Sequence, residues 1–320
     1  MATLYVDRKG IELRVCEGVI DFYEKGKKGS SVPLNAVDRV VIKGDVKFSS
    51  SFLSHLSSRK IGLLILSGRK SEVCSIMYRP HNDARLRLNQ FKSSQDKKFS
   101  LLIAKDLISR KILGQAKHLE QLIENNKTFK SLSSFVFKIK KAGENILNLN
   151  SISSMIGVEG SAANQYFYAL SYLVPEELNF KGRNKNPPQD PINAILSLTY
   201  TLVEKEILRQ SYEAGLDPFV GFIHSPDFGR ESLCWDLIEP LRPVIDDFSL
   251  KLFEFKKFNF SDFETTDNGC KLNKDGRITY YQEYENQATF FRMLVKEEMK
   301  KLIDKILGIA KSHEEQLVCL

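Results

Sequence analysis

Cysteine is scarce in the 320-residue chain and is not arranged for cross-linking or metal binding. The five cysteines are scattered, their number is odd, and they form no CxxC pair. A disulfide framework or a zinc ribbon is therefore not expected, and a reducing cytosol is predicted. The five lie at Cys16, Cys74, Cys234, Cys270 and Cys319.

Long apolar runs are also missing. The longest, such as residues 61–66, are far too short to span a membrane. Acidic and basic residues already occur at Asp7 and Arg8, too early for a secretion signal. We therefore expect a cytoplasmic protein that makes no membrane contact.

Two common nucleotide-binding signatures are absent. The sequence contains no GxxxxGK[ST] loop and no glycine-rich dinucleotide spacing, which disfavours an NTPase or a Rossmann enzyme. The formal net charge, by contrast, is +7 at pH 7, and the isoelectric point is about 9.0. A basic chain favours an acidic partner, although the charge alone does not identify that partner.

The sequence pattern divides the chain into two parts. Residues 1–80 contain short β-branched and aromatic segments separated by turn signals, which predict strands. From Asp83 onward, apolar residues recur at three-to-four spacing, which predicts helices. We expect an α+β fold: a small N-terminal β domain (1–80), a linker (81–96) and a larger all-α catalytic domain (97–320). The expected helices lie near 97–125, 130–148, 159–173, 191–215, 230–255 and 284–311, with a small hairpin within 256–280.

Two distant segments together contain candidate metal ligands. Glu159 lies between two glycines at 157–160, and His224, Asp236 and Glu239 lie within 221–243. Carboxylate oxygens suit Mg²⁺ or Mn²⁺, and Mn²⁺ tolerates one imidazole among them better. On a basic chain, this set suggests divalent-metal chemistry on a polyanion, and we expect that polyanion to be nucleic acid.

Each candidate ligand also has an ordinary interpretation. Asp236 and Glu239 are three residues apart and would share one face of a helix over 230–255, where they could be a solvated acidic edge. Their apolar neighbours favour a fixed site instead. His224 could be a hydrogen-bonded loop residue. Glu159 could complement a helix dipole, although its flanking glycines would let another chain segment or a phosphate approach closely.

Several arginines could contact phosphates near such a site, although each could also be an ordinary surface charge. A guanidinium group holds phosphate oxygens in bidentate fashion. The candidates for nucleic-acid binding are Arg79, Arg85, Arg87, Arg183, Arg230 and Arg242.

A further helix start is predicted at Asp190 and Pro191, because aspartate caps free amides and proline suits the first turn. Asn193 and Tyr200 lie on this helix. They could be polar groups of the core or could support the site.

The order of these motifs resembles a known family, the CRISPR-associated integrase and endonuclease of spacer acquisition, which is the first-numbered Cas protein. The resemblance covers essentially the whole chain, from TLYVD at 3–7 and RLNQ at 87–90 to the segments 157–160, 186–197 and 224–243. Its specificity comes from the ordered combination of Glu159, Asn193, His224, Ser232, Leu233, Asp236, Glu239 and Arg242.

The resemblance implies a fold and a metal site. The β domain would serve dimerisation and partner contacts, and the helical domain would be catalytic. Glu159, His224 and Glu239 would bind Mg²⁺ or Mn²⁺, and Asp236 matches a further catalytic acidic position. Some family members carry Asp where this chain has Glu239, and the longer side chain is expected to reach a metal as well.

The resemblance also implies partners and a reaction. Two homodimers would be bridged by the small second-numbered Cas protein in a heterohexameric complex. That complex would join short double-stranded DNA fragments into a repeat array, and it would act on branched DNA. The metal would activate the 3′-hydroxyl that attacks a phosphodiester bond.

Two other functions fit parts of the sequence. A catalytically silent DNA-binding scaffold could keep the fold, although the joint presence of Glu159, His224 and Glu239 argues against it. An unrelated phosphodiesterase acting on small nucleotides would need a compact pocket. Salt-sensitive binding to long duplex DNA would argue against that enzyme.

Overall fold

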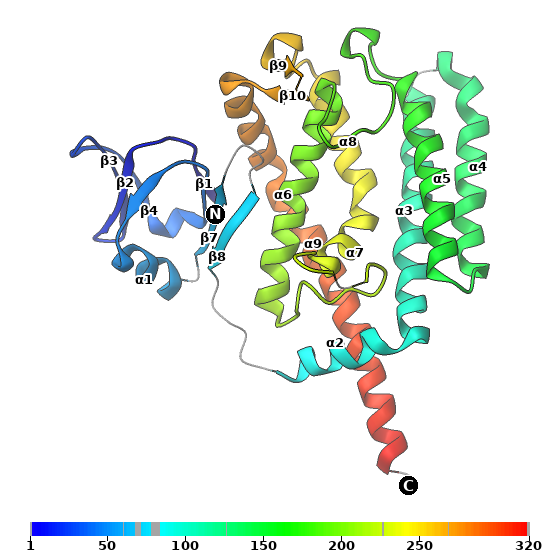
Figure 1. The fold of residues 1–320 in the computed structure, drawn as a ribbon. Coiled ribbons are helices and arrows are strands. Elements are labelled where there is room, and N and C mark those ends of the chain that lie inside the picture. The colour runs from blue at the N-terminus through cyan, green and yellow to red at the C-terminus, as the bar shows by residue number, and fades with distance from the viewer. Residues whose placement is uncertain are drawn as a thin grey trace. The chain divides into compact units, whose positions relative to one another are not determined.

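The computed structural model describes residues 2–59, 61–67, 72–77, 84–125, 127–225, 227–267 and 269–318. Two compact units are present, Met1–Asn82 and Asp83–Leu320 (Figure 1). Among the described residues, no helix is both long enough and apolar enough to cross a membrane.

The N-terminal unit contains two four-stranded sheets. In the first, with the order β1-β5-β7-β8, only β8 runs antiparallel to its neighbour. The second has the order β4-β3-β2-β6. The expected β domain is thereby confirmed. The elements are β1 (Ala2–Val6), β2 (Ile11–Cys16), β3 (Val19–Glu24), β4 (Lys27–Pro33), η1 (Leu34–Ala36), β5 (Val37–Ile42), β6 (Val46–Phe48), α1 (Ser50–Ser58), β7 (Gly62–Ser67) and β8 (Glu72–Met77).

The core of this unit follows from the alternation of side chains along its strands. Leu13 on β2 and Ile20 on β3 are fully buried, as are Phe52 and Leu56 on α1. The β2–β3 hairpin turns at Gly18, whose φ of 80° suits glycine. Burial of one face by α1 fixes the register of these strands, since a slip of one residue would expose the apolar set.

The second unit is mainly helical, as expected. In Figure 1, α3, α4 and α5 run side by side, and α6, α8 and α9 form the rest of the bundle. The elements are α2 (Arg85–Gln95), α3 (Lys97–Asn125), η2 (Lys127–Leu132), α4 (Ser133–Asn145), η3 (Ile146–Asn148), α5 (Ile152–Ser171), η4 (Glu176–Leu178), α6 (Pro191–Ala214), α7 (Ser232–Ile238), η5 (Glu239–Leu241), α8 (Arg242–Glu254), η6 (Phe260–Asp262), β9 (Phe263–Thr266), β10 (Gly269–Leu272) and α9 (Lys274–Val318).

The segment expected to be a linker, 81–96, is helical over most of its length. Gln90 on α2 is fully buried, and its amide donates to the carbonyl oxygens of Asp217 (2.9 Å) and Val220 (2.8 Å). The backbone amide of Asp217 donates back to Gln90 at 2.8 Å. These long-range hydrogen bonds hold α2 in place, so the helical pattern that begins at Asp83 describes this segment better than the expected linker does.

Three expected helices have different bounds. The helix predicted from residue 159 begins at Ile152, with Ser151 as its N-cap, so the two glycines near Glu159 lie inside it. The helix predicted from residue 284 begins at Lys274, directly after the confirmed hairpin of β9 and β10.

The third expected helix, 230–255, is interrupted. α7 ends at Ile238, a 3₁₀ turn covers Glu239–Leu241, and α8 begins at Arg242. Pro240 and Pro243 lack the amide hydrogen that a continuous helix would need at these positions. The expectation that Asp236 and Glu239 share one continuous helix face is therefore wrong.

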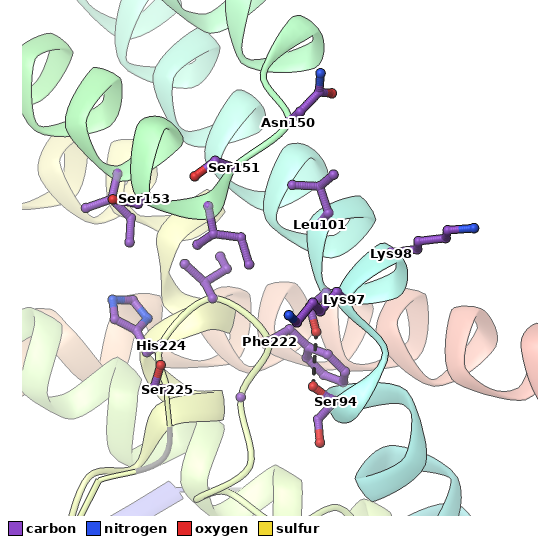
Figure 2. A pocket seen from close by; sticks show the side chains of 15 residues that line it. Ser94, Lys97, Lys98, Leu101, Asn150, Ser151, Ser153, Phe222, His224 and Ser225 are labelled. Carbon is purple, nitrogen blue, oxygen red and sulfur yellow. Dashed lines mark hydrogen bonds between the residues drawn. The ribbon is translucent and has the colours of Figure 1, made fainter.

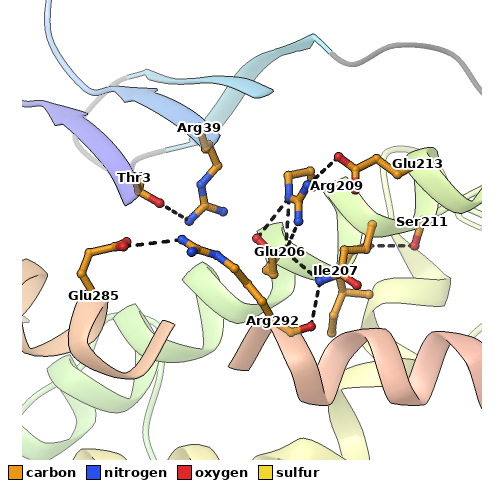
Figure 3. A network of polar contacts seen from close by, with 10 residues as sticks. Thr3, Arg39, Glu206, Ile207, Arg209, Ser211, Glu213, Glu285 and Arg292 are labelled. Carbon is orange, nitrogen blue, oxygen red and sulfur yellow. Dashed lines mark hydrogen bonds and ion pairs between the residues drawn. The ribbon is translucent and has the colours of Figure 1, made fainter. Parts of the chain in front are cut away.

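Polar contacts also join the long helices α6 and α9. Glu206 on α6 is almost fully buried and accepts from Gln210 at 2.8 Å, while Arg209 pairs with both Glu206 and Glu213. The Gln210 amide also donates to the carbonyl oxygen of Arg292 on α9 at 3.1 Å (Figure 3). Every partner within reach of a buried carboxylate reduces the free-energy penalty of its burial.

Two helices of this unit approach unusually closely at a glycine. A Cβ atom on Gly114 of α3 would lie 2.9 Å from Cγ of Pro243, in the first turn of α8. The proline ring is rigid and cannot rotate away. Gly114 therefore sets how closely α3 approaches the residues around Glu239.

Gly114→Ala is expected to lower the free energy of unfolding by roughly 1–3 kcal/mol, because overpacking at Pro243 outweighs the better helix propensity of alanine. Urea unfolding followed by circular dichroism measures the change. Gly308→Ala in α9 is the control, since a Cβ there meets nothing within 4 Å; it should raise stability by about 0.5–1 kcal/mol. Equal effects of the two substitutions would contradict the assigned contact.

Candidate active site

Two acidic side chains from distant segments converge on one lysine. Nζ of Lys111 on α3 pairs with Oε1 of Glu159 on α5 and lies 2.5 Å from Oε2 of Glu239 in η5. The three side chains are 7%, 21% and 9% exposed, respectively. The fold thus brings Glu159 and Glu239 to a common cation in a largely buried place.

The sequence reasoning missed Lys111. The sequence feature that marks it is the position of a lysine on the apolar stripe of α3, where Leu107, Ile108 and Ile112 are also buried. A lysine is almost never buried without a partner. A buried position for this lysine therefore required carboxylates opposite it.

The second oxygen of Glu239 is bound by an arginine. Nε of Arg242 donates to Oε1 of Glu239 at 2.9 Å. Burial alone would raise the pKa of Glu239, but the charges of Arg242 and Lys111 outweigh it and lower this pKa to about 2. For Arg242, burial opposes the charged form, yet Glu239 raises the pKa above its ordinary value.

Asp236 has a different task. It is fully buried and accepts hydrogen bonds from the backbone amides of Phe222 (2.5 Å), Ile223 (3.0 Å) and His224 (3.1 Å). It also contacts Nδ1 of the His224 ring at 2.7 Å. Both oxygens of Asp236 are thus engaged in holding the loop and the ring.

This contact fixes which nitrogen of His224 is available. With Nδ1 directed at Asp236, Nε2 is left for a ligand, an arrangement that raises the basicity of a metal-binding histidine. A Cβ on Gly221 would lie 2.7 Å from Oδ2 of Asp236, so glycine is what lets this loop close around the carboxylate. Asp236 is therefore a positioning residue for His224.

The predicted ligands thus form two pairs: Glu159 with Glu239 around Lys111, and His224 with Asp236. Within the described ranges, no group of three His, Cys, Asp or Glu side chains is close enough to hold a metal ion. The carboxylate pair nevertheless fits Mg²⁺ or Mn²⁺, because both groups supply hard oxygen donors and already converge on one cation. Binding by all three predicted ligands, His224 included, stays a prediction.

The face of α5 that carries Gly157 and Gly160 is open. A Cβ on Gly157 or on Gly160 would meet nothing within 4 Å, so no described chain segment packs there. The flanking glycines were expected to admit either another chain segment or a phosphate. Among the described residues, no chain segment lies there. Room for the backbone of a bound strand remains.

A pocket of about 770 Å³ adjoins His224. His224 and Ser225 line one part of it, while Ser151 and Ser153 at the start of α5 and Lys97 at the start of α3 line others (Figure 2). Its other lining residues are Ser94, Lys98, Ser100, Leu101, Asn150, Ile152, Ile156, Gly221, Phe222 and Ile223. Hydroxyl groups, lysines and two helix starts suit a phosphate backbone.

Tyr200 contacts Arg242 and Asp246 next to the site. The guanidinium group of Arg242 lies over its ring, 4.7 Å from the centroid. The Tyr200 hydroxyl donates to Asp246, a fully buried carboxyl whose pKa is raised by burial. Tyr200 therefore holds Arg242, which in turn holds Glu239.

Asn193 organises the loop before α6. Its amide donates to Asp190 (2.7 Å) and to the carbonyl oxygen of Gly182 (2.8 Å), and its oxygen accepts from Arg183 at 2.8 Å. Asp190 also caps α6, as predicted, because its side chain accepts a hydrogen bond from the backbone amide of Asn193. Asn193 is thus a buried structural residue of this loop.

The predicted phosphate-binding arginines are placed differently. Arg242 belongs to the site, whereas Arg183 is turned inward to Asn193 and Ser197. Arg230 pairs with Asp227 at 2.9 Å and lies over the ring of Trp235. Arg85 and Arg87 lie on α2, and Arg79 falls outside the described residues. Phosphate binding by these arginines remains a prediction.

Acid should weaken the fold through Glu239. Its pKa is about 2 in the folded chain against an ordinary 4.5, so its contribution is complete above pH 4.5 and is lost as pH falls toward 2. This contribution corresponds to about 3 kcal/mol. Urea unfolding between pH 7 and pH 2, with a chelator present, should show a smaller acid loss for Glu239→Gln than for the unmodified protein.

Glu264→Gln serves as the control for that experiment. Glu264 pairs with Lys271 at 3.4 Å, but both side chains are more than half exposed, so the pair contributes little. Its acid profile should match that of the unmodified protein. If Glu239→Gln also followed that profile, the assigned electrostatics would be wrong.

Asp236→Asn should loosen His224, because an amide nitrogen would face backbone donors. The free energy of unfolding is expected to fall by about 2 kcal/mol or more, and Mn²⁺ affinity by roughly 10–100-fold. His224→Ala should lower affinity with a smaller loss of stability, since the three backbone donors to Asp236 remain. Titration calorimetry and urea unfolding measure both quantities. Full stability of Asp236→Asn would show that Asp236 does not position the loop.

Comparison with known proteins identifies the family. The profile of the family described as CRISPR associated protein Cas1 matches residues 4–286. The CRISPR-associated endonuclease Cas1 1 of Thermodesulfovibrio yellowstonii is 40% identical over 312 residues, which covers 96% of this chain and 98% of that protein.

Solved structures share the fold. A casposase bound to its integration product superposes with a TM-score of 0.83 at 22% identity, covering 96% of this chain and 91% of that one. A chain of a Cas6-RT-Cas1–Cas2 complex superposes with a TM-score of 0.79 at 19% identity, covering 96% of this chain and 35% of that one. The sequence resemblance is thereby confirmed, and the chain belongs to the Cas1 family of CRISPR-associated proteins.

Proposed function

We propose that the protein is a metal-dependent DNA endonuclease and integrase that inserts short foreign DNA fragments into a CRISPR array. The observation that carries this proposal is the convergence of Glu159 and Glu239 on one cation. A relative that is 40% identical bears the name of an endonuclease, and the fold is shared with a casposase bound to an integration product. Both support nucleic acid as the substrate.

Glu159 and Glu239 would hold the ion, with Nε2 of His224 as a nitrogen ligand. Mg²⁺ or Mn²⁺ bound there would activate the 3′-hydroxyl of the incoming DNA and stabilise charge on the attacked phosphate. In hydrolysis, water would take the place of that hydroxyl. Asp236 keeps Nδ1 of His224 occupied, so that the ring presents one nitrogen in one orientation.

The other residues bind and orient the DNA strand. The pocket beside His224 offers Lys97, Lys98 and several serines to successive phosphates. The open face of α5 at Gly157 and Gly160 would let the backbone of a DNA strand approach this helix. Contacts of this kind depend on shape and charge rather than on base edges, so binding should weaken steeply with salt.

The proposed assembly follows the family. The substrate is double-stranded or branched DNA with free 3′-hydroxyl groups, and the protein acts as a homodimer in the cytoplasm. A small second-numbered Cas protein would bridge two dimers into a heterohexamer. The solved complex of Cas1 with Cas2 and further domains, which contains a chain of this fold, supports such a partner.

One observation favours a second candidate. Lys111 already neutralises Glu159 and Glu239, as a permanent ion pair would in a catalytically silent scaffold. Such a scaffold would bind DNA with the same salt dependence but would neither cut nor join it.

Strand transfer separates the two candidates. A short duplex with free 3′-hydroxyls is incubated with a supercoiled repeat-bearing plasmid, the partner protein, and Mn²⁺ or Mg²⁺. We expect joining that a chelator abolishes and that Glu159→Gln reduces at least about 10²-fold, since this variant loses a proposed metal-binding carboxylate. DNA binding by Glu159→Gln should be nearly unchanged, since its polar shape is kept.

Glu144→Gln is the matched control, because Glu144 lies on exposed surface at the end of α4; it should join DNA normally. Cleavage of a branched duplex without the partner protein provides a second readout. Intact DNA binding with neither metal-dependent joining nor metal-dependent cleavage in the unmodified protein would establish the scaffold instead.

A further inference from the structure

The ammonium group of Lys111 contacts one oxygen of each of the two carboxylates. The ammonium group reaches Glu239 through Oε2, whereas Arg242 holds the same residue through Oε1. It also reaches Oε1 of Glu159. Lys111 therefore occupies the point at which the carboxylates of α5 and η5 meet, which is also where a shared metal ion would have to lie.

The charges of this cluster are balanced. Lys111 and Arg242 carry two positive charges against the two negative charges of Glu159 and Glu239. A divalent cation added to this set would leave the cluster with two net positive charges in a largely buried place. Like charges at contact distance repel strongly where water is excluded, so one resident cation has to leave.

Lys111 is the more easily displaced of the two cations. Arg242 is held by its hydrogen bond to Glu239 and by the Tyr200 ring beneath it. Lysine ends in a compact ammonium group on a flexible four-carbon chain, and within the described part of the chain no ring lies under that of Lys111. The two carboxylate oxygens that it binds are also those that face each other.

We propose that Lys111 is a resident counter-ion that a divalent metal displaces, so that metal binding at Glu159 and Glu239 is an exchange of cations. The inference rests on the proposed metal site. Lys111 keeps the two carboxylates neutralised when metal is scarce, and its displacement lowers the apparent metal affinity. Occupation of the site therefore requires a higher free metal concentration than the two carboxylates alone would require.

Lys111→Met tests the exchange, because methionine keeps the length and the apolar stem while removing the charge. Without metal, this variant should melt at lower temperature, since two buried carboxylates lose a shared partner. It should bind Mn²⁺ on the order of tenfold more tightly than the unmodified protein. Free Mn²⁺ measured by electron paramagnetic resonance gives the affinity, and differential scanning fluorimetry gives the melting temperature.

Lys205→Met is the matched control. Nζ of Lys205 lies 2.7 Å from Glu231, and the two side chains are 14% and 15% exposed, so this variant also loses a partly buried cation beside a carboxylate. It should be destabilised without any tightening of Mn²⁺ binding. A similar gain of affinity in Lys205→Met would show a general charge effect and would overturn the exchange.

Lys111→Arg keeps the positive charge and provides a second test if Lys111→Met does not fold. Guanidinium pairs with carboxylates in bidentate fashion and is harder to displace. Its Mn²⁺ affinity should fall several-fold below that of the unmodified protein. Unchanged or tighter binding by Lys111→Arg would contradict the proposal.

The outcomes separate this inference from the proposed function. Mn²⁺ binding that is equal in the unmodified protein and Lys111→Met, and lost in Glu159→Gln, would overturn the exchange and leave the metal site standing. No Mn²⁺ binding in any of these proteins would overturn both. Tighter binding in Lys111→Met that depends on Glu159 would support both.

Discussion

The ion cluster of Lys111, Glu159 and Glu239 is the interaction on which the helical unit depends. Its members come from α3, α5 and the turn before α8, so the cluster cannot form unless all three segments pack closely. Gly114 permits that approach on one side, where Pro243 touches α3. A buried carboxylate is stable only with a partner, and the chemistry of the site is therefore also a condition on its packing.

The break between α7 and α8 gives the two neighbouring acids separate roles. On a continuous helix, Asp236 and Glu239 would face the same way and repel each other. In the structure, Glu239 contacts Lys111 and Arg242 from the 3₁₀ turn, whereas Asp236 on α7 contacts the loop of His224. Glu239 thus contacts the cation, and Asp236 orients the imidazole ring of His224.

The sequence predicted the elements with strong patterns and missed those that depend on distant contacts. α3 has the expected bounds, because its apolar residues recur over many turns. The segment 81–96 is predicted as a linker, because the sequence does not show the buried contacts that Gln90 of α2 makes with Asp217 and Val220. The glycines beside Glu159 suggested a helix start, yet α5 begins earlier at its Ser151 cap. Residue type and order identify the candidate ligands, whereas the sequence marks Lys111 only as a lysine on an apolar stripe and does not show which carboxylates lie opposite it.

The length of Glu239 matters to this arrangement. Its two oxygens are divided between a guanidinium group fixed on Tyr200 and an ammonium group on a flexible chain. An aspartate at this position would be one methylene shorter and would have to give up reach toward one of these cations. Because the guanidinium group is anchored, Glu239 keeps one oxygen in a constant position whatever occupies the other. A carboxylate held in this way can accept a new cation on its second oxygen without reorganising its backbone, which is the property that a pre-organised metal ligand needs.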